Sequence, residues 1–101
     1  MSDRPIYIDI DGTLTDQPVQ PWGNALASRL ARVRELVAEG RQVVIWSGGG
    51  TVYAKAFCKQ YGLEGVTAIG KPEAIVDDNP LLRPTGRMSI IAPDEYFKED
   101  A

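Results

Sequence analysis

Two aspartates stand two residues apart at the end of a short apolar run near the start of the chain. The run at residues 6–8 is β-branched and aromatic, which predicts a buried strand, and Asp9 and Asp11 follow it. Residues two apart on a strand point to the same side, so the two carboxylates are aimed together. Such a pair is tolerated when a cation lies between the carboxylates or when one of them holds a proton. The spacing therefore indicates a site for a hard metal ion and for phosphoryl chemistry.

The composition narrows this chemistry further. The chain has 101 residues, no histidine and one cysteine. These counts exclude Ser-His-Asp and Cys-His catalysis, histidine-based zinc sites and an intrachain disulfide. A reaction here must use carboxylates, Lys, Ser or Thr, Tyr and backbone amides, with an oxygen-preferring metal such as Mg²⁺.

The length and charge set the expected class of protein. Hydrophobic residues make up 44% and charged residues 25% of the chain, which is typical of a soluble globular domain. We expect a single domain over residues 1–101, in the cytoplasm and without a membrane partner. The net charge of −3 disfavours nucleic acid as a main partner, although a nucleic acid carrying a phosphate stays open as a substrate.

Strand-like and helix-like patterns alternate along the chain. Further strands are predicted at residues 42–46, 66–69, 74–77 and 88–91, and helices at 25–39, 51–61 and 93–98. Asn24 is expected to cap the first helix, and Gly40 and Gly62 to end the first and second. The second helix is expected to bury Val52, Ala56 and Phe57. The alternation predicts an α/β fold with a parallel sheet, in which the third and fourth strands need not be neighbours because no helix fits between them.

Polar residues follow four of these strands. The clusters are Asp9 with Asp11, Ser47 with Gly48, Gly49 and Gly50, then Lys71, and lastly Asp77 with Asp78. The carboxyl ends of parallel strands lie at one edge of a sheet, so the clusters are expected to converge on one crevice. A carboxylate is a competent nucleophile on phosphorus, and glycine amides near a helix N-terminus can hold phosphate oxygens. Taken alone, the glycine run also fits a flexible loop, Lys71 an ordinary surface lysine, and the last acidic pair a common turn.

The ordered set resembles the motifs of the haloacid dehalogenase (HAD) superfamily of phosphatases. Asp9-x-Asp11-x-Thr13 is similar to the first motif, and Ser47 after its hydrophobic strand is similar to the second. Lys71 is the candidate for the third motif, and Asp77 with its neighbour Asp78 is similar to the fourth. The resemblance covers residues 6–80. It implies a Rossmann-like, HAD-type three-layer sandwich with a central parallel sheet of about five strands, the first strand between the second and fourth, and no cap domain.

The resemblance also implies a role for each residue. Asp9 is the expected nucleophile and a metal ligand, and Asp11 the expected general acid/base, with its backbone carbonyl on Mg²⁺. The remaining implied roles are phosphate binding by Thr13, Ser47, Gly48 and Gly49, charge neutralisation by Lys71, and completion of the metal shell by Asp77 or Asp78. Only five residues separate Lys71 from Asp77, so Lys55 and Lys59 stay as alternative third-motif lysines.

The expected activity is Mg²⁺-dependent phosphomonoester hydrolysis through an aspartyl-phosphate. Without a cap, the site would accept a small or a polymer-attached phosphate, unless the loop at residues 14–22 or another subunit covers it. The alternative is a non-catalytic or receiver-like module that binds Mg²⁺ or phosphate. Receiver domains carry adjacent acidic residues after the first strand, whereas one residue separates Asp9 from Asp11 here, which favours the hydrolase.

Overall fold

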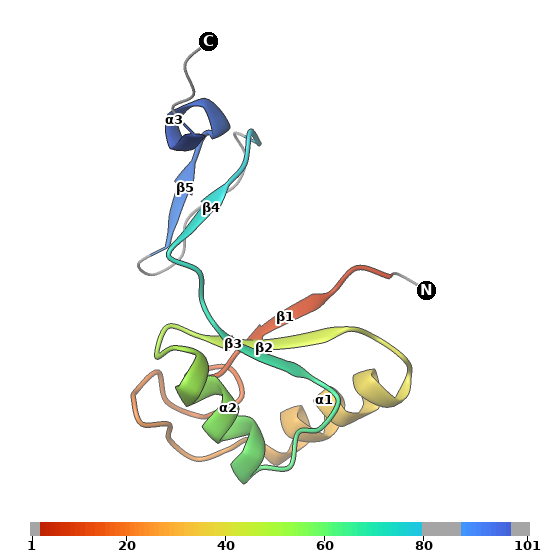
Figure 1. Cartoon of the computed structure of the whole chain (residues 1–101). Helices are drawn as coiled ribbons and strands as arrows, with labels where there is room; N and C mark the ends of the chain where they lie inside the picture. Colours follow the sequence, from red (N-terminus) through yellow and green to blue (C-terminus); the bar gives the residue numbers. More distant parts are fainter. Residues whose placement is uncertain (1–2, 80–87, 98–101) are drawn as a thin grey trace. The chain divides into compact units, whose positions relative to one another are not determined.

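The computed structural model describes residues 3–79 and 88–97. The chain divides after Gly70 into two compact units, the first up to Gly70 and the second from Lys71 onward. Each unit is described by itself. The first contains β1 (Ile6–Asp9), α1 (Ala27–Ala38), β2 (Val43–Ser47), α2 (Thr51–Gln60) and β3 (Thr67–Gly70) (Figure 1). The second contains β4 (Ala74–Val76), β5 (Ser89–Ile91) and α3 (Pro93–Phe97). The elements agree closely with those predicted from the sequence, while the single domain over residues 1–101 stays a prediction.

The first unit is a β-α-β-α-β arrangement. Its three strands are parallel and lie in the order β1-β2-β3, with Asp9 beside Trp46 and Ser47 beside Gly70. Because the strands follow one another in sequence order, successive right-handed crossovers place both helices on the same face of the sheet. Figure 1 shows α1 and α2 on that face. The first unit therefore has two layers.

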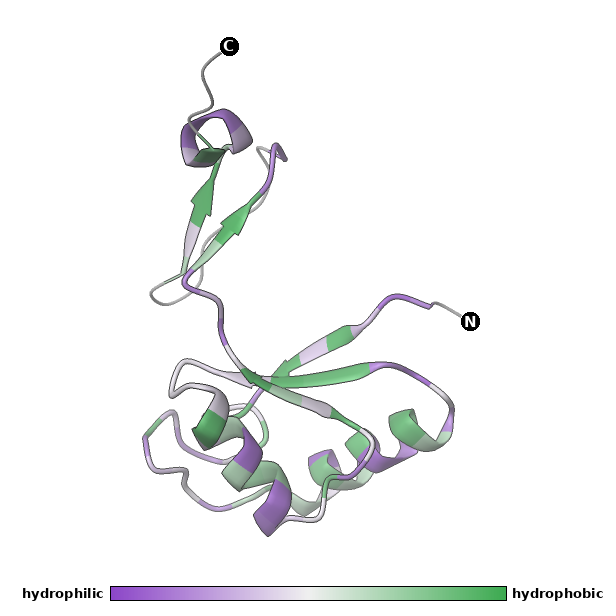
Figure 2. Ribbon diagram, in the orientation of Figure 1, coloured by the Kyte–Doolittle hydropathy of each residue, from purple (hydrophilic) through white to green (hydrophobic). Residues whose placement is uncertain are grey.

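The core of this unit lies between that face and the two helices. Leu30 and Val33 of α1 and Phe57 of α2 are buried there against Val43 and Ile45 of β2. Figure 2 shows hydrophobic colouring along the strands and on parts of both helices. This packing fixes how the two helices lie on the sheet, and so it positions the loops that leave the strand ends.

The buried side of α2 differs in part from the expected one. Phe57 is fully buried as expected, but Val52 is 83% exposed and Ala56 is exposed. Ala54 and Cys58 are buried in their place. The residues that face the core are thus three and four apart, at 54, 57 and 58, and positions 52 and 56 lie on the opposite side of the helix.

The helix ends follow local rules with one exception. Gly40 and Gly62, which have positive φ, each follow their helix, α1 or α2, after one intervening residue, as predicted. The N-cap of α1 is Leu26, so the prediction that Asn24 caps this helix is wrong. Asn24 instead donates from its backbone N and its Nδ2 to the carboxylate of Asp16, at 2.9 and 3.1 Å.

The second unit has its own small parallel sheet. β4 pairs with β5, and the ladder is extended by the bonds Asp77 N to Ile91 O and Ser89 N to Glu73 O, both of 3.0 Å. The sequence left open whether the third and fourth strands are neighbours, and β3 and β4 belong to different sheets. The position of the first strand between the second and fourth, implied by the resemblance, is not found: β1 is the edge strand of its sheet, and β4 lies in a separate sheet with β5.

The described residues thus confirm a mixed α/β chain with parallel strands. The five strands lie in two sheets of three and two, not in the single central sheet that was predicted. A third layer over the first sheet would need the strand order to reverse, and within residues 3–70 it runs in one direction only. Across residues 3–79 and 88–97, no helix combines the length and the apolar character needed to cross a membrane.

Candidate active site

The chain turns sharply where β1 ends. The backbone N–H groups of Thr13, Leu14 and Thr15 all donate to the carbonyl oxygen of Ile10, at 2.8 to 3.2 Å. Gly12 has φ of +80°, a conformation that side chains with a Cβ rarely adopt. A Cβ at this position would also lie 3.2 Å from Cβ of Pro18. The turn therefore requires glycine, and it holds the two aspartates of the first motif at the strand end.

A hydroxyl group orients the carboxylate of Asp9. Thr13 Oγ1 donates to Asp9 Oδ2 at 3.2 Å, and the Thr13 carbonyl accepts a 2.6 Å hydrogen bond from Nη1 of Arg29 on α1. Thr13 was predicted to bind phosphate. In the structure its side chain contacts Asp9, and its phosphate role stays a prediction.

A second hydroxyl group holds the carboxylate of Asp11. Tyr53 Oη, in the first turn of α2, donates to Asp11 Oδ1 at 2.6 Å. The pKa of Tyr53 is raised well above its ordinary value, first by burial and then by the hydrogen bond to Asp11 and the charges of Asp11 and Asp9. The phenol is therefore a protonated donor at neutral pH.

The loop after β2 reaches the same place. Ser47 ends the strand beside β1, is 1% exposed, and accepts a 3.0 Å hydrogen bond through Oγ from the backbone N of Gly49. A Cβ on Gly49 would lie only 2.9 Å from Cγ of Tyr53. Gly48 is exposed with open space around it. The acidic pair and the Ser47 loop thus both lie beside the Tyr53 side chain. The Gly49 N–H, which was predicted to bind phosphate, donates to Ser47 Oγ here.

The loop at residues 14–22 is anchored at its base and at Trp22. Thr15 forms an antiparallel bridge with Ala25, and the Asp16 carboxylate holds Asn24. Trp22 packs its ring edge-on against Tyr53, Phe57 and Tyr61 of the α2 segment, at centroid distances of 5.2, 5.1 and 6.5 Å. The loop therefore lies on α2 through an aromatic cluster, and its predicted use as a lid stays a prediction.

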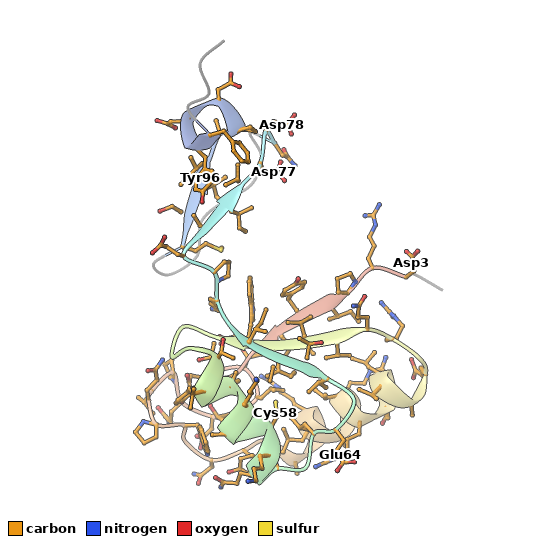
Figure 3. All side chains as sticks on the ribbon, in the orientation of Figure 1. Asp3, Cys58, Glu64, Asp77, Asp78 and Tyr96 are labelled. Atoms are coloured by element: carbon orange, nitrogen blue, oxygen red, sulfur yellow. The ribbon has the colours of Figure 1, made fainter. Side chains whose placement is uncertain are left out.

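The other two predicted clusters belong to the second unit. Lys71 is its first residue. Asp77 and Asp78 follow β4, and Figure 3 labels both. Asp77 Oδ1 accepts a 2.7 Å hydrogen bond from the backbone N of Asn79, and Asp78 is exposed. The roles of these three residues at the site of the first unit stay predictions. The alternative lysines, Lys55 and Lys59, are exposed on α2.

The donor chemistry of the first unit fits a hard cation. Asp9 and Asp11 supply carboxylate oxygens, and the described ranges 3–79 and 88–97 contain no cluster of three or more His, Cys, Asp or Glu side chains suited to a metal. Mg²⁺ keeps several of its waters and commonly uses only one or two protein carboxylates together with substrate phosphate. An acidic pair with a neighbouring backbone carbonyl thus has the donor types that Mg²⁺ commonly uses, and a Mg²⁺ site here stays a prediction.

Sequence reasoning missed Tyr53. The signal in the sequence was the spacing of Tyr53, Phe57 and Tyr61, four residues apart, which places three aromatic rings on one side of the helix that follows the Ser47 loop. The sequence matches no protein-family model, no curated protein and no solved structure. Function must therefore be argued from the site itself.

Proposed function

We propose that the chain is a Mg²⁺-dependent phosphomonoester hydrolase of the HAD type, working through an aspartyl-phosphate on Asp9 with Asp11 as general acid/base. One observation carries the proposal. Asp9 ends β1 and Asp11 follows it, and each carboxylate accepts a hydrogen bond from its own hydroxyl donor. The Ser47 loop follows β2, the strand paired with β1. The contact of Thr13 with Asp9 is local to the turn, but the donor to Asp11 comes from α2, 42 positions along the chain, which a solvated turn residue would not need.

The chemistry divides between the two carboxylates. An Asp9 oxygen attacks phosphorus, and the bond from phosphorus to the ester oxygen breaks while Asp11 gives its proton to that oxygen. Water then attacks the phosphorus of the aspartyl-phosphate, Asp11 takes a proton from it, and Asp9 is released as a carboxylate with inorganic phosphate. Mg²⁺, held by the Asp9 carboxylate and the Asp11 carbonyl, would supply positive charge against the two anions that must meet. The thiol of Cys58 takes no part, since it is buried in the core.

We also propose that the first unit has a Rossmann-like fold and that the protein is located in the cytoplasm. The β-α-β-α-β order of parallel strands supports the first of these. The lone cysteine, which forms no disulfide, supports the second. The substrate class is a phosphate monoester, small or attached to a polymer.

The test is Mg²⁺-dependent hydrolysis of p-nitrophenyl phosphate by the wild type and by Asp9→Asn. We expect the substitution to reduce kcat by at least a hundredfold, because an amide is a poor nucleophile on phosphorus. Asp3→Asn is the matched control, since Asp3 is an exposed aspartate before β1 and should keep the wild-type rate. Equal rates for the wild type and Asp9→Asn would refute the nucleophile. Phosphate or Mg²⁺ binding without any turnover would instead support the binding-module alternative.

A further inference from the structure

Tyr53 connects α2 to the carboxylate that the proposed reaction uses for proton transfer. Its Oη lies 2.6 Å from Asp11 Oδ1, and the two residues are 42 positions apart in the sequence. Asp11 is partly buried, so the hydrogen bond is not simply one of many that water could replace. A carboxylate with one oxygen held this way presents its other oxygen in a restricted direction.

The tyrosine is itself held in place by packing. Its ring lies edge-on to Trp22 at 5.2 Å and 72°, and the absence of a side chain at Gly49 makes room for it on another side. Trp22 is fixed by its further contacts with Phe57 and Tyr61. The hydroxyl position is therefore set by the tertiary structure and not by the freedom of an exposed side chain.

The hydrogen bond suits both states of the proposed acid/base. When Asp11 carries its proton on Oδ2, Oδ1 is a carbonyl oxygen and still accepts from Tyr53. When Asp11 is ionised, both oxygens accept. Tyr53 can thus hold Oδ1 in both halves of the reaction, while Oδ2 gives a proton to the leaving oxygen and later takes one from water.

We propose that Tyr53 is a positioning residue that aims Oδ2 of Asp11 at the reacting oxygens. The inference rests on the proposed function. It predicts that loss of the Tyr53 hydroxyl lowers kcat/KM most for esters with poor leaving groups, because these depend most on protonation of the leaving oxygen.

The test compares Tyr53→Phe with the wild type on aryl and alkyl phosphate monoesters whose leaving groups span a wide range of pKa. The substitution removes the hydroxyl and keeps the ring against Trp22. We expect a less than fivefold fall in kcat/KM for p-nitrophenyl phosphate and a fall of roughly 10- to 100-fold for an alkyl phosphate, part of the 10²- to 10⁴-fold that a general acid contributes. Tyr61→Phe is the matched control, because it removes a hydroxyl from the same aromatic cluster and should leave the leaving-group dependence unchanged.

Two further measurements separate positioning from structure. In the Asp11→Asn background, Tyr53→Phe should have little additional effect on the leaving-group dependence, since it acts through Asp11. The fraction of enzyme trapped as phosphoenzyme by acid quench should rise in Tyr53→Phe with p-nitrophenyl phosphate, because activation of water is slowed. The Mg²⁺ affinity measured by titration calorimetry should stay within twofold of the wild type.

A uniform fall in kcat/KM for all esters, or no fall, in Tyr53→Phe would overturn the role of Tyr53. If Asp9→Asn still abolished hydrolysis, the proposed function would stand. An equal effect of Tyr53→Phe with and without the Asp11 carboxylate would also overturn it. Absence of Mg²⁺-dependent hydrolysis in the wild type would overturn both proposals.

Discussion

Gly70 lies where the end of β3 passes against the start of α2. A Cβ added to Gly70 would be 2.9 Å from Cα of Gly50 and from the backbone N of Thr51. These are backbone atoms, which cannot rotate away as a flexible side chain would. The Gly70 N–H also donates to Thr51 Oγ1 at 2.9 Å. The residue thus fixes the separation between the strand and the helix that carries Tyr53.

We predict that Gly70→Ala destabilises the first unit by about 1–3.5 kcal/mol. Overpacking against rigid atoms costs about 1–3 kcal/mol, and the hydrogen bond from the residue 70 N–H to Thr51, which the added Cβ would break by pushing the two backbones apart, is worth about 1 kcal/mol more. The smaller entropy of the unfolded alanine chain offsets about 0.4–1 kcal/mol of this, because Gly70 is not among the glycines with positive φ.

Urea unfolding followed by tryptophan fluorescence measures this change, since Trp22 and Trp46 both lie in the first unit. With a slope of about 1 kcal/mol per M, the low end of the usual range because the unit is small, this loss lowers the urea midpoint by roughly 1–3.5 M. Gly48→Ala is the control, because a Cβ there meets no atom within 4 Å and its φ is not positive. The control should stay within about 0.5 kcal/mol of the wild type. A midpoint for Gly70→Ala equal to that of Gly48→Ala would refute the close approach of β3 to α2.

Two other positions give equally direct tests. Gly12→Ala should cost about 1–2 kcal/mol, because a Cβ is disfavoured at φ of +80° and would crowd Pro18; the same urea series measures it, and an unchanged midpoint would contradict the turn geometry. Burial raises the pKa of the Cys58 thiol to about 11, so at pH 8 little thiolate is present. Iodoacetamide should therefore label Cys58 slowly in the native protein and faster in urea, as followed by mass spectrometry. Equal rates in both conditions would show that the thiol is accessible.

The sequence predicted the local features of the fold well. β1 and β2 begin as apolar runs, as predicted; β2 is buried, but the prediction that β1 is a buried strand is wrong in part, since Tyr7 is 49% exposed and the rest of β1 is half-buried. Gly40 and Gly62 follow their helices because a positive φ is needed there. The side of α2 that faces the core was predicted less well, since Val52 is apolar but lies on the outer face of the helix. Short helices of mixed composition fit more than one buried stripe, and only the packing against the sheet decides between them.

The sequence predicted the two carboxylates of the candidate site, but it did not predict the tyrosine that donates to one of them. Asp9 and Thr13 are four residues apart, so their contact follows from the turn alone. The contact between Asp11 and Tyr53 joins residues 42 positions apart and depends on how α2 lies on the sheet. The pairing of β4 with β5 is likewise a long-range outcome that the pattern of apolar runs does not specify.

This difference in origin has a consequence for the proposed reaction. The donor to Asp9 comes from the same turn, so it persists as long as Gly12 keeps the turn closed. The donor to Asp11 comes from α2, whose start is set by the contact between Gly70 and Gly50. A change that moves the start of α2 therefore disturbs proton transfer before it disturbs the nucleophile. In Gly70→Ala, the folded fraction should lose alkyl phosphate hydrolysis more than p-nitrophenyl phosphate hydrolysis, because the displaced helix carries the tyrosine and not the threonine.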